Sequence, residues 1–308
     1  MSLTDGRWGD DEWKRVWKRF TGRSWADLKG VWIGAVPTTI EIGSKPDPGL
    51  DDLSALIDLT PSDWLNARCQ NTSGLRPNAL LEALYLFQKC SHTSLAAQRL
   101  ASVGMNSWCL FNAYHSAYLG AKGILALLGV AFPVLNGTQV AVDLFPEPEK
   151  KQSRNDLKEN GRRFDDFLIM RFPKLDQRRM WQALHRLLRV CDVGCWDGTM
   201  VSEILGVRYD EVTPPRNHFL YKVTYWPLND LMADEVGVDL GSMVRQSLDV
   251  ATDGFLLRLS LLVHRLLERM VNDLAASSPV IKVQLDASRF GATGDSPELD
   301  LYRSVVLQ

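Results

Sequence analysis

The chain has 308 residues, of which 45% are hydrophobic and 23% charged, and its formal net charge is -2. These values are ordinary for a globular protein, and the length is ample for a sizeable core. They also exclude the strongly basic class of nucleic-acid binders, so any contact with RNA or DNA must come from a local patch.

Tryptophans crowd the first tenth of the chain. Residues 10–20 predict a short helix, because Trp13, Trp17 and Phe20 recur at helical spacing. The aromatic residues of this region either pack the helix onto the body of the protein or form a surface for a partner or for stacked bases. They are Trp8, Trp13, Trp17, Trp25 and Trp32.

Two segments near opposite ends of the chain have strand-like patterns. Residues 31–43, VWIGAVPTTIEIG, are rich in β-branched residues, and the tail turns strand-like again in PVIKVQLDASRF. We expect residues 31–43 and 280–288 to pair in a small sheet.

The middle of the chain predicts helices. The strings LLEALYLFQKC and SLAAQRLASVG, which follow Asn78, are typical of one or two apolar helices. Residues 107–130 predict the longest and most apolar helix, which we expect at the centre of the core because apolar residues surround it almost completely. Phe132-Pro133 and Asn136-Gly137 are its expected stop signals.

The second half predicts two further helices. Residues 176–190 form an amphipathic pattern, and residues 255–274 form a leucine-rich one. The charged run 147–163 favours a solvated loop or helix edge, and a helix is expected to start at Pro215 or Arg216. The inner face of the amphipathic helix should comprise Trp181, Leu184, His185, Leu187 and Leu188.

The predicted fold class is therefore mainly α, a helical bundle with a small β element from the N- and C-terminal segments. We divide the chain into residues 1–75, a tryptophan-rich helix, strand and irregular region packing on the body, and residues 76–308, a helical bundle with a strand-like tail.

The five cysteines predict reduced, buried thiols in a cytoplasmic protein, because their number is odd and their surroundings are apolar. His185, Cys191 and Cys195 lack the second close pair that zinc sites usually show, so we expect neither a metal nor a cofactor. The apolar stretch 113–134 is interrupted by polar residues and predicts a buried helix instead of a membrane span, and the polar, acidic start is not a signal peptide.

Familiar catalytic signatures are missing from the sequence: it contains no Walker A loop, dinucleotide GxGxxG, HExxH or GxSxG motif. Two strings nevertheless resemble a known family. NAYHSAYLGAKGILALLGV is similar to the second helix of the HEPN superfamily of helical-bundle domains, and PPRNHFLYK is similar to the start of its last conserved helix. The first string carries the likeness through Tyr114-His115, Ala117-Tyr118, Ala121-Lys122 and Leu127-Leu128.

The resemblance implies a bacterial toxin–antitoxin or antiviral defence protein and a metal-independent endoribonuclease, with two sites meeting at a dimer interface. In active members an arginine binds the scissile phosphate, and a histidine that follows after four to six intervening residues acts as general acid or base. Here the matching arginine is Arg216, followed by Asn217, and Tyr221 occupies the first slot expected for histidine. His218 comes too early.

The chain is therefore either a non-catalytic relative or a member whose site is rebuilt. The candidate catalytic residues are Arg216, Asn217, His218, Tyr221 and His115. Two other pairs, Arg179–His185 and Arg258–His264, match the loose spacing, but residues six apart on a straight helix point away from each other.

Three functions remain open. The first is an RNA-cleaving or RNA-binding HEPN-like protein, and the second is a non-catalytic subunit that binds a protein partner or a second copy of itself. An enzyme with an unfamiliar helical pocket is the third. We expect no association with membranes.

Overall fold

The computed structural model describes residues 16–35, 68–70, 75–103, 105–135, 138–146, 166–171, 175–194, 198–207, 212 and 254–290. These residues fall into two compact units that interleave along the chain. Unit 1 comprises Met1–Glu82, Leu125–Asp176 and Arg186–Gly194, and unit 2 comprises Ala83–Ile124, Gln177–His185 and Cys195–Gln308. The boundary between residues 75 and 76 stays a prediction.

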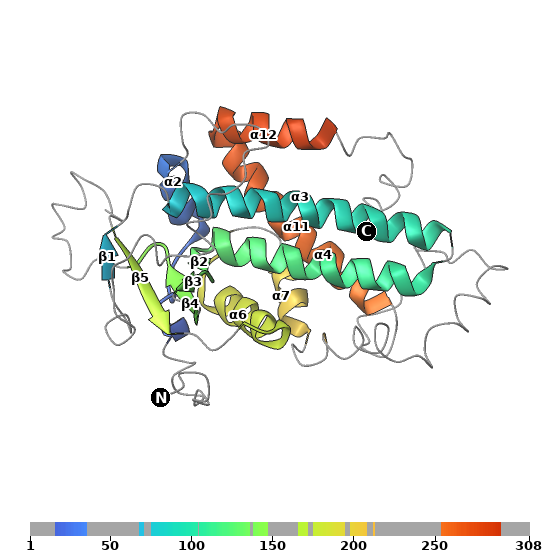
Figure 1. The fold of residues 1–308 in the computed structure, drawn as a ribbon, viewed down its shortest axis with the longest axis horizontal. Coiled ribbons are helices and arrows are strands. Elements are labelled where there is room, and N and C mark those ends of the chain that lie inside the picture. The colour runs from blue at the N-terminus through green and yellow to red at the C-terminus, as the bar shows by residue number, and fades with distance from the viewer. Residues whose placement is uncertain are drawn as a thin grey trace. The chain divides into compact units, whose positions relative to one another are not determined.

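Helices dominate the described part of the chain, which confirms the mainly α fold class (Figure 1). Their bounds are α2 Trp25–Ala35, α3 Leu75–Ser102, α4 Asn106–Leu127, α6 Gln177–Val190, α7 Gly198–Gly206, α11 Gly254–Ser277 and α12 Pro279–Phe290. The expected inner face of α6 is buried, including His185. None of the helices in the described ranges is long and apolar enough to cross a membrane.

A small antiparallel sheet belongs to unit 1. Its strands are β1 Arg68–Gln70, β2 Val130–Ala131, β3 Val134–Leu135, β4 Thr138–Asp143 and β5 Asp166–Arg171. Their order is β1-β5-β4-β2, with β3 also paired to β4. The central pair places Val142 opposite Ile169, and both residues are completely buried.

The small sheet is confirmed as a feature of the fold, but it does not come from the segments predicted for it. Residues 31–35 belong to helix α2, and residues 280–288 belong to helix α12, so the predicted pairing of two terminal strands is wrong. Residues 36–43 lie outside the described part.

Capping residues explain both differences. Ser24 precedes α2 and its Oγ accepts a hydrogen bond from the backbone N–H of Asp27 at 3.1 Å, while Asp27 also suits the positive end of the helix dipole. Ser278 precedes α12 in the same way, and its Oγ accepts from Ile281 N–H at 3.4 Å. Pro279 then occupies the first helical position, which proline favours.

Three N-terminal tryptophans pack inside unit 1. Trp17, Trp25 and Trp32 are buried, which confirms the packing interpretation for them. The indole N–H of Trp32 donates to the carbonyl of Leu127 at 2.8 Å, and its ring meets Phe145 edge-on at 4.8 Å. Trp8 and Trp13 lie outside the described residues.

The central helix α4 ends at Leu127, earlier than predicted. It is also not the longest helix, because α3 has 28 residues and α4 has 22. Gly129, with φ of +88°, terminates the helix, because L side chains rarely adopt that conformation. A Cβ at this position would also lie 2.7 Å from the ring of Phe145. The Phe132-Pro133 stop signal is therefore not used: these residues follow β2.

One face of α4 is the expected buried spine of unit 2. The side chains of Ala113, Ala117, Ala121 and Ile124 are completely buried. On the same helix, Gly120 and Gly123 lie against Val263 and Leu267 of α11, so that these two helices pack closely. The opposite face of α4 is only partly buried, since Phe111, His115 and Tyr118 are half-buried and Trp108 is exposed, contrary to the expectation of a helix enclosed on all sides.

Candidate functional site

Four of the five predicted catalytic residues, Arg216, Asn217, His218 and Tyr221, lie outside the described part of the chain and remain predictions. The fifth, His115, lies on the less buried face of α4. The structure therefore tests the surroundings of His115 alone among the five.

His115 is held by its own helix. Its Nδ1 lies 3.1 Å from the carbonyl oxygen of Phe111, one turn earlier. Because a carbonyl oxygen only accepts hydrogen bonds, Nδ1 must carry the hydrogen, and the neutral imidazole then offers Nε2 as an acceptor. The side chain is half-buried. His115 can thus accept a hydrogen bond or a proton from a molecule that reaches this face.

Aromatic side chains line the same face of α4, and we call Trp108, Phe111, His115 and Tyr118 the α4 stripe. Spacings of three, four and three residues place them on one side of the helix. Trp108 is 42% exposed, and the other three are half-buried. Large aromatic side chains are normally used to fill cores, so a partly exposed row of four indicates a binding surface.

The rings of the stripe contact one another. The centroids of Trp108 and Phe111 are 5.8 Å apart, and those of Phe111 and His115 are 4.1 Å apart. Buried Tyr114 continues the row, at 5.9 Å from His115 and 6.4 Å from Tyr118. This mutual support holds the exposed rings in place before any ligand arrives.

A hydrogen bond brings basic residues to the middle of α4. The Tyr114 hydroxyl donates to Oε1 of Gln177 at 2.8 Å, which fixes the start of α6 beside the stripe. The next two residues of α6 are Arg178, which is exposed, and Arg179, which is half-buried. Two arginines therefore follow directly on the residue that bonds to Tyr114, and exposed Asp176 precedes it.

The sequence around the stripe contains no acidic residue. Between Glu82 and Asp143 there is neither aspartate nor glutamate, although the chain has 37 of them among 308 residues. The same stretch contains Lys89, Arg99 and Lys122. Segment 83–142 thus has a positive formal charge within a chain whose net charge is -2.

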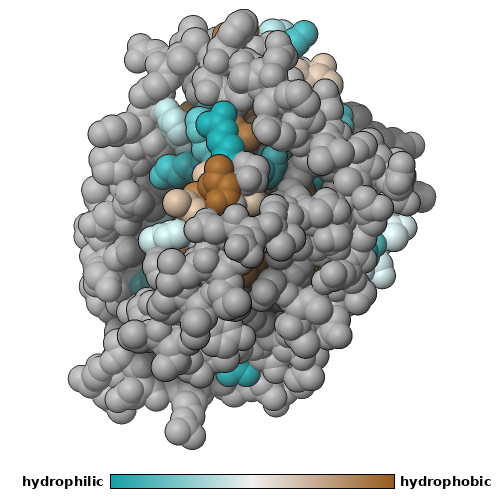
Figure 2. Space-filling view, turned by 90° about the vertical axis from the view of Figure 1, so that its right-hand side faces the viewer, coloured by the Kyte–Doolittle hydropathy of each residue, from teal (hydrophilic) through white to brown (hydrophobic). Residues whose placement is uncertain are grey.

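Exposed apolar residues extend the stripe into the turn between α3 and α4. Val103 is 65% exposed and Met105 49% exposed, and Trp108 begins the stripe one turn further along. The turn lies at the right-hand end of α3 and α4 in Figure 1, and Figure 2, which faces that side, shows an apolar area directly beside hydrophilic residues. The exposed apolar residues of the turn therefore adjoin the exposed end of the stripe.

The Arg258–His264 pair on α11 does not form a joint site. The Arg258 guanidinium binds Glu203 of α7, with 2.9 Å between Nη2 and Oε2. His264 instead lies 2.8 Å from the Ser91 hydroxyl through Nε2 and stacks on Phe87. The two side chains thus have separate partners, in agreement with the geometric objection raised above.

His264 is a packing residue of the α3–α11 contact. The Ser91 hydroxyl donates to the Phe87 carbonyl at 3.0 Å, so the hydrogen between Ser91 and His264 comes from Nε2. Burial lowers the pKa of His264, and the negative charge of Glu268 partly offsets that effect. The imidazole is therefore neutral at pH 7 and serves as a hydrogen-bond donor.

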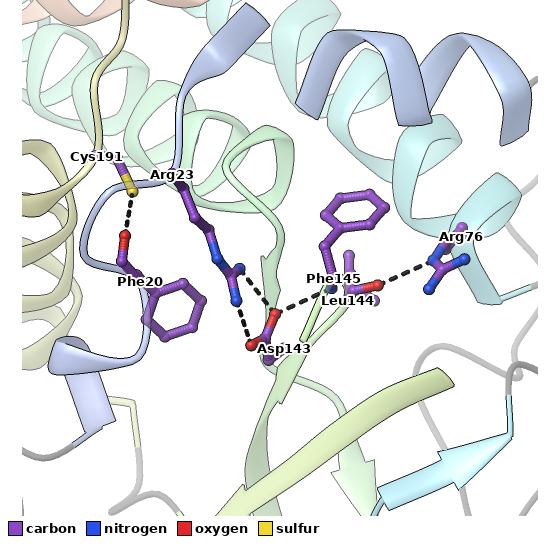
Figure 3. Close-up of polar contacts among 7 residues, drawn as sticks. All are labelled: Phe20, Arg23, Arg76, Asp143, Leu144, Phe145 and Cys191. Carbon is purple, nitrogen blue, oxygen red and sulfur yellow. Dashed lines mark hydrogen bonds and ion pairs between the residues drawn. The ribbon is translucent and has the colours of Figure 1, made fainter. Parts of the chain in front are cut away.

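Unit 1 contains a buried ion pair (Figure 3). Nη1 of Arg23 donates to Oδ1 of Asp143 at 2.8 Å, Nη2 donates to Oδ2, and the two side chains are only 7% and 1% exposed. The Phe145 N–H donates to Asp143 as well, and the guanidinium lies 4.3 Å from the centroid of the Phe20 ring.

Two further hydrogen bonds hold the backbone around the Arg23–Asp143 pair. The Cys191 thiol donates to the Phe20 carbonyl at 3.6 Å, and Arg76 Nε donates to the Leu144 carbonyl at 2.9 Å (Figure 3). Burial raises the pKa of Cys191 to about 12, although Arg23 lowers it and Asp143 raises it slightly further. The ion pair ties the N-terminal segment to strand β4, and its enclosure leaves a substrate no approach.

Comparison with known protein families, curated proteins and solved structures found no match. The HEPN resemblance therefore remains a prediction that rests on the two strings quoted above. Sequence reasoning selected His115 but missed Trp108, Phe111 and Tyr118. The recurrence of aromatic residues at three- and four-residue spacing, within a stretch free of acidic residues, is the signal that would have found them.

Proposed function

We propose that the protein is a HEPN-like helical protein that binds RNA, and that the α4 stripe is its binding surface. The observation that supports this function is the row of partly exposed, mutually contacting rings on α4. Nucleobases stack on aromatic side chains, including histidine, and such stacking contributes about 1–3 kcal/mol per base.

Charge favours an anionic ligand for this surface. Arg178 and Arg179 follow Gln177, which bonds to Tyr114, and the chain from 83 to 142 lacks acidic residues. RNA combines flat apolar bases with a phosphate backbone, which matches aromatic rings next to guanidinium groups.

RNA cleavage is a second step of the proposal. By the resemblance it would depend on Arg216, with Asn217, His218 and Tyr221, and His115 would contribute Nε2 as a proton acceptor. The setting would be a bacterial defence or toxin–antitoxin system. Cleavage of labelled RNA in EDTA by the wild type, lost in Arg216→Ala, would support it. Cleavage that Arg216→Ala leaves unchanged would remove Arg216 from the mechanism.

The binding step is tested by fluorescence anisotropy with a labelled stem-loop RNA. Trp108→Ala should weaken binding roughly 5- to 150-fold, the equivalent of about 1–3 kcal/mol for one lost stacking contact. Val283→Ala is the matched control, because Val283 is an exposed apolar residue of the same unit on α12. Equal losses in both variants, or no binding by the wild type, would contradict the proposal.

A protein partner is the second candidate function, favoured by the exposure of Val103 and Met105 beside Trp108. Under this alternative the same surface joins two copies of the chain. Light scattering of the wild type and of Trp108→Ala separates the two functions. A dimer that Trp108→Ala dissociates, together with no RNA binding, would assign the surface to self-association.

A further inference from the structure

We infer that the α4 stripe binds a short run of unpaired nucleotides, about three in length, and that it does not bind duplex RNA. The inference rests on the proposed function and adds to it the form and length of the RNA. It follows from the spacing of the rings, from their exposure and from the position of the two arginines of α6.

The rings are spaced more widely than stacked bases. The ring centroids are 5.8 Å apart for Trp108 and Phe111 and 4.1 Å apart for Phe111 and His115. Bases stacked within one strand of a duplex follow each other at about 3.4 Å. Successive bases can meet successive rings only when the strand is stretched and unstacked.

Stacking also requires a free base face. In a duplex both faces of each base are covered by the neighbouring pairs, whereas an unpaired base can turn its face to an aromatic ring. Trp108 and the half-buried Phe111, His115 and Tyr118 offer rings, and stacking on an aromatic ring is open to every base because each base has a flat π-face. The stripe therefore selects unpaired bases with little preference for sequence.

The length of the stripe limits how many nucleotides it holds. Trp108 and Tyr118 are ten residues apart, a distance of about 15 Å along the helix. With four rings and at most one base on each, about three to four nucleotides fit. His115 can accept a hydrogen bond through Nε2 near the middle of this run, because Nδ1 is engaged with Phe111.

The arginines of α6 set the expected dependence on salt. Arg178 and Arg179 follow Gln177, which bonds to Tyr114 next to the stripe, and we expect them to supply the contacts to two phosphates of the strand. For single strands the logarithm of the binding constant falls with the logarithm of the salt concentration by about 0.7 per phosphate contacted. Two contacts therefore contribute about 1.4 to that slope.

The experiment measures the anisotropy of labelled uridine trimers, hexamers and dodecamers, and of a blunt duplex of the dodecamer with its complement, against the full chain. We expect the affinity per binding site to level off near the trimer and the duplex to bind at least about tenfold more weakly. Equal binding of single strand and duplex would overturn the inference while leaving RNA binding intact. No binding of any of the RNAs would instead overturn the proposed function.

Two variants assign the contact to this surface. Arg178→Gln/Arg179→Gln should reduce the salt slope for the trimer by about 1.4. Arg186→Gln/Arg189→Gln makes the same change of charge at exposed positions further along α6 and should leave the slope unchanged. Equal effects of the two double variants would overturn the placement of the strand on the stripe.

Discussion

Gly120 of α4 lies so close to Val263 of α11 that a Cβ added to the glycine would stand 2.7 Å from Val263 Cγ1. Gly123, three residues later, would meet Leu267 Cδ2 at 2.8 Å in the same way. The buried side of α4 is thus fixed by close helix contact, and the same orientation turns Trp108, Phe111, His115 and Tyr118 to the other side.

Gly120→Ala should therefore destabilise the protein by about 1–3 kcal/mol, because the stiff, β-branched Val263 cannot move aside without repacking. Gly123→Ala should cost less, since the terminal methyl group of Leu267 can rotate. Chemical denaturation measures both. Gly30→Ala is the matched control: Gly30 lies within α2 with no atom near its added Cβ, so the change should stabilise by up to about 1 kcal/mol. Equal stability of Gly120→Ala and the wild type would contradict the close contact.

The buried Arg23–Asp143 pair predicts a strong effect from removing one partner. Asp143→Asn leaves the guanidinium of Arg23 enclosed without its counter-charge, and we expect a loss of about 3–5 kcal/mol in the free energy of unfolding. The double variant Arg23→Met/Asp143→Leu should recover most of that loss, because it removes both charges.

The partly exposed Arg258–Glu203 pair serves as the control for the buried one. Glu203→Gln should change the free energy of unfolding by less than about 1 kcal/mol, because solvent screens this pair. If Asp143→Asn and Glu203→Gln lowered the free energy of unfolding by similar amounts, the claim that the buried pair stabilises the fold would be contradicted.

Acid should weaken the α3–α11 contact through His264. Burial lowers the pKa of His264 below its ordinary value of 6.5, so the unfolded chain takes up the proton at a higher pH than the folded one. The stability that the neutral imidazole supplies is fully present above pH 6.5 and is lost as the pH falls toward the folded pKa. Urea denaturation between pH 7.5 and 5.5 should show this loss.

Substitution identifies the histidine responsible. His264→Gln should flatten the pH dependence, because glutamine keeps an N–H donor for Ser91 and does not titrate. His92→Gln replaces an exposed histidine of α3 and should leave the profile as in the wild type. A profile that is the same in all three proteins would contradict the assignment to His264.

The buried thiols should resist alkylation. Burial raises the pKa of Cys90, Cys109 and Cys191 to about 12 in each case, so at pH 8 only about one thiol in ten thousand is a thiolate. Mass spectrometry after brief iodoacetamide treatment should find these three cysteines unmodified in the folded protein and modified in urea. Rapid modification of any of them in the folded protein would contradict its burial.

Helical periodicity made much of the fold predictable. The pattern of Trp181, Leu184 and Leu188 correctly identified the inner face of α6, because burial on one side of a helix imposes that spacing. Short alternating stretches were misleading. Residues 280–284 of α12, VIKVQ, resemble a strand, but the alternation covers only a few residues, and the capping residue Ser278 favours a helix. The Ser278-Pro279 start signal was the better guide.

The sheet and the site were harder to predict for physical reasons. Strands β4 and β5 are buried on both faces, so their central residues show no alternation between apolar and polar side chains. The α4 stripe was hidden for the opposite reason. Its residues are as apolar as those of a core, and only the close packing on the Gly120 side determines which face remains exposed.

Ultraviolet crosslinking of the full chain to a 4-thiouridine-labelled single-stranded RNA, followed by mass spectrometry of the crosslinked peptides, tests RNA binding by the α4 stripe most directly. We predict crosslinks on the peptide that contains Trp108, Phe111, His115 and Tyr118, and their loss in Trp108→Ala. Crosslinks confined to other peptides, or the same yield on this peptide in Trp108→Ala, would contradict the account.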